Sequence, residues 1–272
     1  MPVPTTCHKI PLPTGGTLNV HEAGQGPAIV CLHGFPLDHR MWLGQLRGLS
    51  PHHRVIAPDL RGFGQSLGSE PVGSLDDFAH DLTTMLDVLE LQEPVVLCGL
   101  SMGGYIAFRF AALMPQRLRG LIFCDTRAAA DTDDARDNRH RMVAIVRKGG
   151  VATVADAMHS KLFAGETFER QPDVVENTRS IMVASSADAV AAALLAMAAR
   201  TDSTALLPSL SCPSLWLCGS EDVITPPDEM QHAASLAPQS AFVEIKDAGH
   251  MAPLEQPLAV NDAITTFMAS LK

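Results

Sequence analysis

The sequence lacks an excess of positive charge. Its 272 residues contain 20 Lys and Arg against 30 Asp and Glu, which gives a formal net charge of -10 and an isoelectric point near 5.5. Phosphate backbones and anionic lipid headgroups are bound by basic surfaces. We therefore expect neither nucleic acid nor a membrane surface as a partner.

Long apolar runs and an export signal are also missing. The longest stretch of small apolar residues, 189–199, is much shorter than the roughly 18 residues that a membrane-spanning helix needs. Residues 1–6 have neither the basic region nor the apolar region of a secretory signal. These two absences predict a cytoplasmic protein without a membrane span.

The cysteines form no CxxC pair, and no histidine stands near them at the spacing of a zinc site. Four of the six end an apolar run, where a reduced thiol behaves as a small hydrophobic side chain. We therefore expect no bound metal and no cofactor. The six are Cys7, Cys31, Cys98, Cys124, Cys212 and Cys218.

Short apolar runs alternate with longer helical patterns along most of the chain. At the start, Thr14-Gly15-Gly16 separates the strand-like segments 7–12 and 17–22, which predicts an antiparallel hairpin. The later runs are apolar on both faces, as is typical of parallel strands covered by helices on both sides. The sequence therefore predicts an α/β protein with a mostly parallel, doubly wound sheet. The runs are 28–32, 55–57, 95–98, 121–124, 215–218 and 242–245.

The sheet pattern stops between residues 127 and 206, where only helix-like stretches occur. We interpret 127–206 as a helical cap inserted into a core formed by 1–126 and 207–272. In the core, Ser74 followed by Asp77 predicts the start of a helix. The predicted helices of the cap are 139–148, 151–161, 172–185 and 187–199.

A candidate nucleophile, Ser101, follows the apolar run 95–98 in the motif Gly99-Leu-Ser-Met-Gly103. A helix-like stretch then continues to Pro115. A serine on a sharp turn from strand to helix projects its hydroxyl from the sheet, and the flanking glycines leave room for that turn. The helix amino terminus would stabilise an oxyanion formed during attack.

A serine nucleophile needs a base, and His250 is the best of the 11 histidines. It follows the last strand-like run on a loop that contains Gly249, at the same sheet edge as Ser101. The third member must accept a hydrogen bond from the imidazole. Asp222, directly after the run 215–218, keeps the order nucleophile, acid, histidine. Asp125, at the end of an earlier run, is the competing acid.

The run 28–32 leads into the loop His33-Gly34-Phe35-Pro36. We expect His33 to shape this loop. The loop would bring the Phe35 amide opposite the serine turn, where it and the Met102 amide could donate to the oxyanion of a tetrahedral intermediate.

Together these motifs resemble the α/β-hydrolase superfamily. The resemblance rests on His33-Gly34-Phe35, the segment 58–66, the serine turn, the segment 219–227 and Gly249-His250, and it covers nearly the whole chain. It implies the α/β-hydrolase fold with a helical cap insertion. Haloalkane dehalogenases and epoxide hydrolases resemble this scaffold but use aspartate as the nucleophile, so Ser101 argues against both.

The length of the cap and the segment 219–227 are similar to those of carboxylesterases and enol-lactonases. This similarity implies hydrolysis of a small-molecule ester or lactone through an acyl-enzyme, by a monomer or homodimer. Pro36 also occurs at this place in cofactor-free perhydrolases and haloperoxidases, although a proline that only stiffens the loop is the simpler interpretation. The same motifs are compatible with a carbon-carbon bond hydrolase and with a non-catalytic ligand receptor.

Methionines of the cap and residues beside the motifs are candidates for the walls of a substrate pocket. Flexible methionine side chains adapt to irregular space. A mostly apolar pocket of this kind would favour small or medium acyl groups over highly charged ones. The candidates are Trp42, Met142, Met158, Met182 and Met251.

Overall fold

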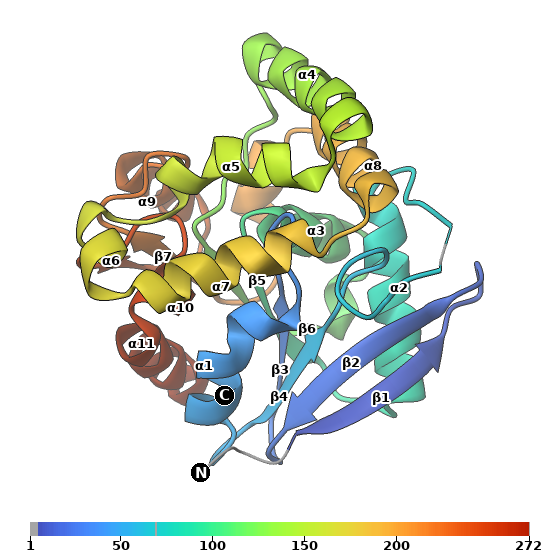
Figure 1. Cartoon of the computed structure of the whole chain (residues 1–272). Helices are drawn as coiled ribbons and strands as arrows, with labels where there is room; N and C mark the ends of the chain where they lie inside the picture. The colour runs from blue at the N-terminus through green and yellow to red at the C-terminus, as the bar shows by residue number, and fades with distance from the viewer. Residues whose placement is uncertain (1–4, 69, 272) are drawn as a thin grey trace.

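The computed structural model describes residues 5–68 and 70–271 (Figure 1). Its strands are β1 (Thr6–Pro11), β2 (Thr17–Ala23), β3 (Ala28–Leu32), β4 (Arg54–Pro58), β5 (Val95–Leu100), β6 (Leu118–Cys124), β7 (Ser214–Gly219) and β8 (Ser240–Ile245). They form one sheet in the order β1-β2-β4-β3-β5-β6-β7-β8. The pairs β1-β2 and β2-β4 are antiparallel and the others are parallel. The predicted hairpin and mostly parallel sheet are therefore confirmed.

Helices cover both faces of the sheet. In the core they are η1 (His39–Trp42), α1 (Leu43–Leu49), α2 (Leu75–Val88), α3 (Met102–Leu113), η2 (Pro115–Arg117), η3 (Thr204–Ser209), α9 (Pro227–Leu236), α10 (Ala252–Glu255) and α11 (Pro257–Ser270). Successive side chains of a strand point to opposite faces. In β3, Val30 and Leu32 accordingly join one hydrophobic cluster with α2 and α3, whereas Ile29 and Cys31 join a second with α1 and α11.

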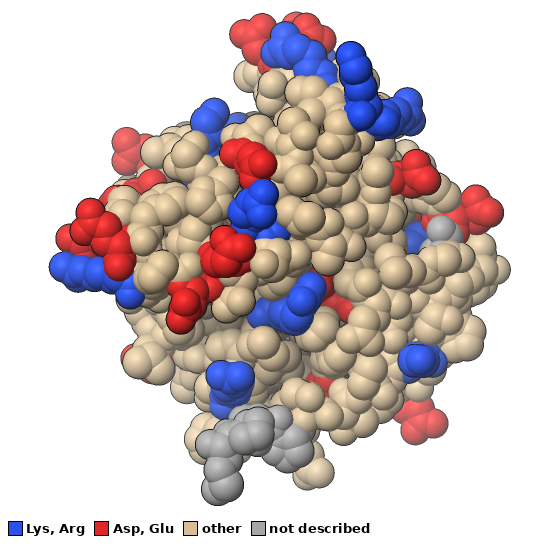
Figure 2. Space-filling model, viewed as in Figure 1, with Lys and Arg blue, Asp and Glu red and all other residues tan. Residues whose placement is uncertain are grey.

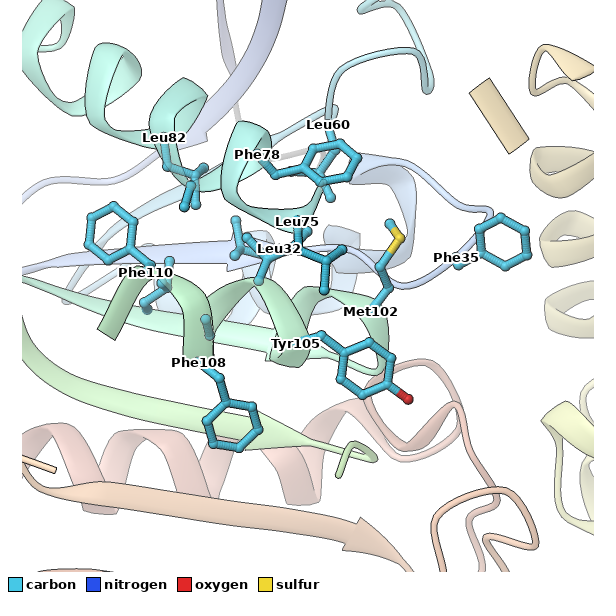
Figure 3. Close-up of a cluster of buried hydrophobic side chains, with 14 of the residues drawn as sticks. Leu32, Phe35, Leu60, Leu75, Phe78, Leu82, Met102, Tyr105, Phe108 and Phe110 are labelled. Carbon is cyan, nitrogen blue, oxygen red and sulfur yellow. The ribbon is translucent and has the colours of Figure 1, made fainter. Parts of the chain in front are cut away.

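The α2 helix begins as its sequence predicts. The side chain of Ser74 and the N3 residue Asp77 form a reciprocal capping box, in which Asp77 Oδ2 accepts from the Ser74 N–H at 3.0 Å. Figure 3 shows Leu82 of α2 pointing toward α3, with the Phe78 ring beside Leu60. The apolar face of α2 thereby holds α3, and with it the serine turn, against the sheet.

Between β6 and β7, five α-helices precede η3: α4 (Asp133–Gly149), α5 (Val151–Leu162), α6 (Gly165–Arg170), α7 (Pro172–Val183) and α8 (Ala187–Ala198). Figure 1 shows them together on one side of the molecule, with α4 projecting farthest from the sheet. This insertion matches the helical character predicted for 127–206. The division into core and cap domains stays a prediction.

Two details of the inserted helices differ from the prediction. The α4 helix begins at Asp133 rather than at 139, because Thr132 caps it by accepting from the Ala135 N–H at 3.2 Å, while its polar first turns carry no apolar pattern. The short α6 was not predicted. It is held by a residue distant in sequence, since Glu255 accepts hydrogen bonds from Ala164 and Thr167 at 2.8 and 2.6 Å.

On the face shown in Figure 2, acidic and basic side chains are interspersed, and α4 itself carries both signs. Within 5–68 and 70–271, no helix alone is both long and apolar enough to cross a membrane. Only α7 and α8 taken together reach that length and composition, and the two are bent by 95° at their junction.

Candidate active site

Ser101 lies at the tight junction between β5 and α3, with φ of 53° and ψ of -112°. A non-glycine residue with positive φ is strained, and the surrounding bonds hold it there. The Ser101 N–H donates to the Cys124 carbonyl at 3.0 Å, and its own carbonyl accepts from the Thr126 hydroxyl at 2.8 Å. A Cβ at Gly99 would overlap the backbone of Gly103, so the turn requires glycine at that position.

The His250 ring bridges the other two predicted residues. Its Nε2 lies 2.9 Å from Ser101 Oγ, and its Nδ1 lies 2.8 Å from Asp222 Oδ2. His250 is buried on the loop that follows β8, where the Gly249 N–H donates to Glu255 Oε1 at 2.8 Å. A base within hydrogen-bond reach of a nucleophile and oriented by a carboxylate is the arrangement that activates a serine hydroxyl.

Asp222 is held as an ionised acceptor on the loop that follows β7. Its Oδ1 accepts from the Ile224 and Thr225 amides at 2.7 and 3.0 Å, and its Oδ2 accepts from the Thr225 hydroxyl as well as facing His250. Burial acts to raise the pKa of Asp222, but His250 and the bonds from Thr225 outweigh it and hold the pKa below its ordinary value. The carboxylate can therefore stabilise an imidazolium.

Asp125, the competing acid, lies behind Asp222 and is turned to another partner. Its Oδ1 accepts from the Gly219 N–H at 2.8 Å, and His250 makes its carboxylate contact with Asp222 instead. Complete burial, followed by the charge of Asp222, raises the pKa of Asp125 well above its ordinary value. Asp125 therefore positions the strand end that carries Asp222.

The loop after β3 is shaped by His33, as predicted. The Leu60 N–H donates to His33 Nε2 at 3.0 Å, which leaves Nδ1 to donate to the Gly34 carbonyl at 2.9 Å. A Cβ placed on Gly34 would lie 2.6 Å from Leu100 Cδ2 and 3.6 Å from Ser101 Cβ. The loop backbone therefore passes directly over the serine turn.

Two backbone amides are available beside Ser101. The Phe35 N–H has no backbone acceptor among the described residues, and Met102 is the first residue of α3, whose N–H has no partner within the helix. The next residue of the loop, Pro36, contacts the inserted segment between β6 and β7. The Ser185 hydroxyl of that segment donates to the Pro36 carbonyl at 3.2 Å.

A cavity of about 90 Å³ contains Ser101 and His250. Two of the proposed wall residues, Met158 and Met251, line it, and so does the Phe35 side chain. The lining residues are Phe35, Leu100, Ser101, Tyr105, Arg139, Met158, Leu162, Met197, Ile224, His250 and Met251.

The structure does not place Trp42, Met142 or Met182 among the described residues that line this cavity. Trp42 and Met182 are fully buried in the second hydrophobic cluster, where packing holds them away from the cavity. Met142 lies about one helical turn beyond Arg139 on α4 and packs on the first cluster.

Two polar residues of the cavity wall were not predicted from the sequence. Tyr105 could have been found, because it follows Ser101 by four residues on α3 and residues four apart share a helix face. Arg139 could not, because its place depends on how α4 lies across the site. Burial acts to lower the pKa of Arg139, but the Asp131 carboxylate and Tyr105 raise it above its ordinary value.

A larger cavity of about 740 Å³ lies at the amino ends of the strands, bordered by Ala28, Val96 and Leu118. It contains none of the three hydrogen-bonded residues. In an open α/β sheet the reacting groups lie at the carboxyl ends of the strands. We therefore assign the chemistry to the smaller cavity.

Two groups of described residues offer ligand atoms within 4.8 Å of one another, as a metal site would. In the group Asp125, Cys218 and Asp222, burial raises the pKa of the Cys218 thiol, and the Asp222 carboxylate already faces His250. In the second group, the rings of His21 and His39 are stacked at 3.5 Å with 10° between their planes. The Nδ1 atom of His39 lies 2.7 Å from Asp59 Oδ1, so this carboxylate already has a hydrogen-bond partner within the protein.

Comparisons with known proteins agree with this geometry. Residues 27–257 match the family model described as alpha/beta hydrolase fold. The chain belongs to the α/β-hydrolase fold family. The predicted family resemblance and the predicted fold are both confirmed.

Relatives within the α/β-hydrolase fold family include one solved structure of high similarity. A thermophilic esterase from Thermogutta terrifontis, solved with malate bound, is 44% identical with a TM-score of 0.94, covering 98% of this chain and 99% of the other. The 3-oxoadipate enol-lactonase 1 of Acinetobacter baylyi is 28% identical over 95% of each chain. The pimeloyl-[acyl-carrier protein] methyl ester esterase of Xanthomonas oryzae is 27% identical over 93% of this chain and all of its own.

Proposed function

We propose that this α/β-hydrolase cleaves carboxylic esters or lactones through an acyl-enzyme formed on Ser101. The observation that carries the proposal is the hydrogen-bonded series from Ser101 Oγ through the two nitrogens of His250 to Asp222, with contacts of 2.9 and 2.8 Å. The relatives named esterase and enol-lactonase place the chain among the carboxylic ester hydrolases.

In the first step, Ser101 Oγ attacks the ester carbonyl while His250 Nε2 takes its proton. The tetrahedral oxyanion accepts hydrogen bonds from the Phe35 and Met102 amides, and Asp222 stabilises the imidazolium. His250 then gives the proton to the leaving alkoxide, which departs as the alcohol. Water then attacks the acyl group while His250 takes its proton, and collapse of this second tetrahedral intermediate releases the acid while His250 returns the proton to Ser101 Oγ.

The size of the cavity limits the substrate. A volume of about 90 Å³, walled partly by Met158 and Met251, suits a short acyl group. The malate bound to the Thermogutta relative is a small carboxylic acid, the class of product that ester hydrolysis releases. We therefore propose short-chain esters or small lactones as substrates.

A fluorophosphonate probe tests the nucleophile directly. Intact-mass and peptide analysis should find one adduct, on Ser101, and Ser101→Ala should remove both the adduct and at least about 10⁴-fold of kcat. Ser235→Ala is the matched control, because Ser235 is exposed on α9. Labelling that persists in folded Ser101→Ala protein, or turnover that survives the substitution, would refute the proposal.

A further inference from the structure

One wall of the cavity carries a cationic group that the reaction at Ser101 does not use. The Arg139 side chain reaches the cavity from α4 and is only 19% exposed. Burying a guanidinium is costly unless its charge and its N–H groups are satisfied. The hydrogen-bond and ion-pair partners of Arg139 therefore show whether the protein itself satisfies the charge and the N–H groups of this side chain.

Arg139 shares its counter-ion with a second arginine. Its Nε and Nη2 donate to Asp131, which is 3% exposed, and Arg200 Nη1 donates to the same carboxylate. Arg200 is itself 3% exposed, and its Nη2 donates to the Ala129 carbonyl at 2.7 Å. Two guanidinium groups thus share one carboxylate within ion-pair distance in 5–68 and 70–271, and the next carboxylate that interacts with Arg200 is that of Asp202.

The remaining N–H donor of Arg139, at Nη1, faces a weak acceptor. Its Nη1 faces the Met197 sulfur at 3.5 Å, and a thioether is a weak acceptor. Beyond Asp131, the Tyr105 hydroxyl is an oxygen within reach of Arg139, so the two polar side chains meet at this wall. Met197 and Arg139 both line the cavity, so this donor lies where a ligand can reach it.

Tyr105 supplies a second donor at the same wall. Figure 3 shows its hydroxyl pointing out of the hydrophobic cluster, on the side where the Phe35 ring lies. The Arg200 guanidinium lies 4.1 Å from the centre of the Tyr105 ring and fixes its position. Tyr105 follows Ser101 by about one turn of α3, and both residues line the cavity.

We propose that Arg139 and Tyr105 form a subsite for a carboxylate on the substrate. The substrate is then an ester or lactone that carries a second, free carboxylate a few bonds from the carbonyl that Ser101 attacks. Such a carboxylate pairs with Arg139 and replaces the Met197 sulfur with a charge-assisted oxygen acceptor. This inference rests on the proposed ester hydrolysis, and it reverses the expectation that the pocket disfavours charged groups.

The test compares matched pairs of small esters. On the acyl side, methyl hydrogen succinate is compared with methyl valerate; on the alcohol side, acetoxyacetate is compared with propyl acetate. The measured quantity is the ratio of kcat/KM for the carboxylated ester to that for its neutral partner, followed by pH-stat at pH 7.5. In at least one pair, Arg139→Gln should lower this ratio about 10- to 100-fold, and Tyr105→Phe should lower it less.

Arg141→Gln is the matched control, because Arg141 is exposed on the same helix, and it should leave the ratio unchanged. If Arg139→Gln does not fold, Arg139→Lys and Tyr105→Phe decide the question by the same ratio. A ratio that stays within about 3-fold in both pairs would overturn the carboxylate subsite while ester hydrolysis stands. Failure of the wild type to hydrolyse any ester, neutral ones included, would refute the proposed function and this inference with it.

Discussion

Gly34→Ala tests whether the loop after β3 stabilises the oxyanion. An added Cβ would lie 2.6 Å from Leu100 Cδ2, whereas carbon atoms in contact are about 3.5 to 4.0 Å apart, so the loop and the Leu100 side chain together must give way by about 1 Å. The Phe35 amide follows directly and moves with the loop. A displacement of this size can lower catalysis about 100-fold, comparable to losing one oxyanion donor.

We therefore expect kcat and kcat/KM of Gly34→Ala to fall together by about 100-fold on a short aryl ester, because the affected bond forms only in the transition state. Gly165→Ala is the matched control, since nothing lies within 4 Å of a Cβ there. Removing the clashing side chain in Gly34→Ala/Leu100→Ala should restore part of the activity lost in the single variant. A folded Gly34→Ala protein with kcat within about 3-fold of wild type would refute the reasoning.

Two further predictions concern the surroundings of the site. Burial raises the pKa of Asp125, so the folded state binds the Asp125 proton more tightly than the unfolded state does. The stability that this proton contributes is present at low pH and is lost as pH rises from the ordinary carboxyl range through the pKa of the folded state. Asp125→Asn should therefore gain Tm relative to wild type between pH 4 and pH 8 in thermal unfolding scans, and a pH-independent difference would contradict this. Met158→Ala should extend hydrolysis toward acyl chains about two carbons longer, because Met158 lines the cavity. Met142→Ala, on the same insertion but outside the lining, should leave the chain-length profile unchanged, and an equal shift in both variants would contradict the assignment of the wall.

Local chemistry along the chain was enough to predict the fold and the elements that carry the site. The turn at Ser101 depends on a strand, two glycines and a helix that are contiguous in sequence, and the clash that excludes a side chain at Gly99 comes from Gly103, four residues further on. The capping box of Ser74 and Asp77 is local in the same sense. Alternating apolar runs and helices predicted the parallel sheet because each run must bury both of its faces.

Tertiary structure alone decided which distant side chains meet. Asp125 and Asp222 both follow strands of one sheet edge, and only the path of the loop after β7 turns Asp222 rather than Asp125 toward His250. The residues that line the cavity were harder still to predict from the sequence, because they depend on how α4 and α5 pack over the site. Arg139 reaches the site by that packing, and no spacing in the sequence relates it to Ser101.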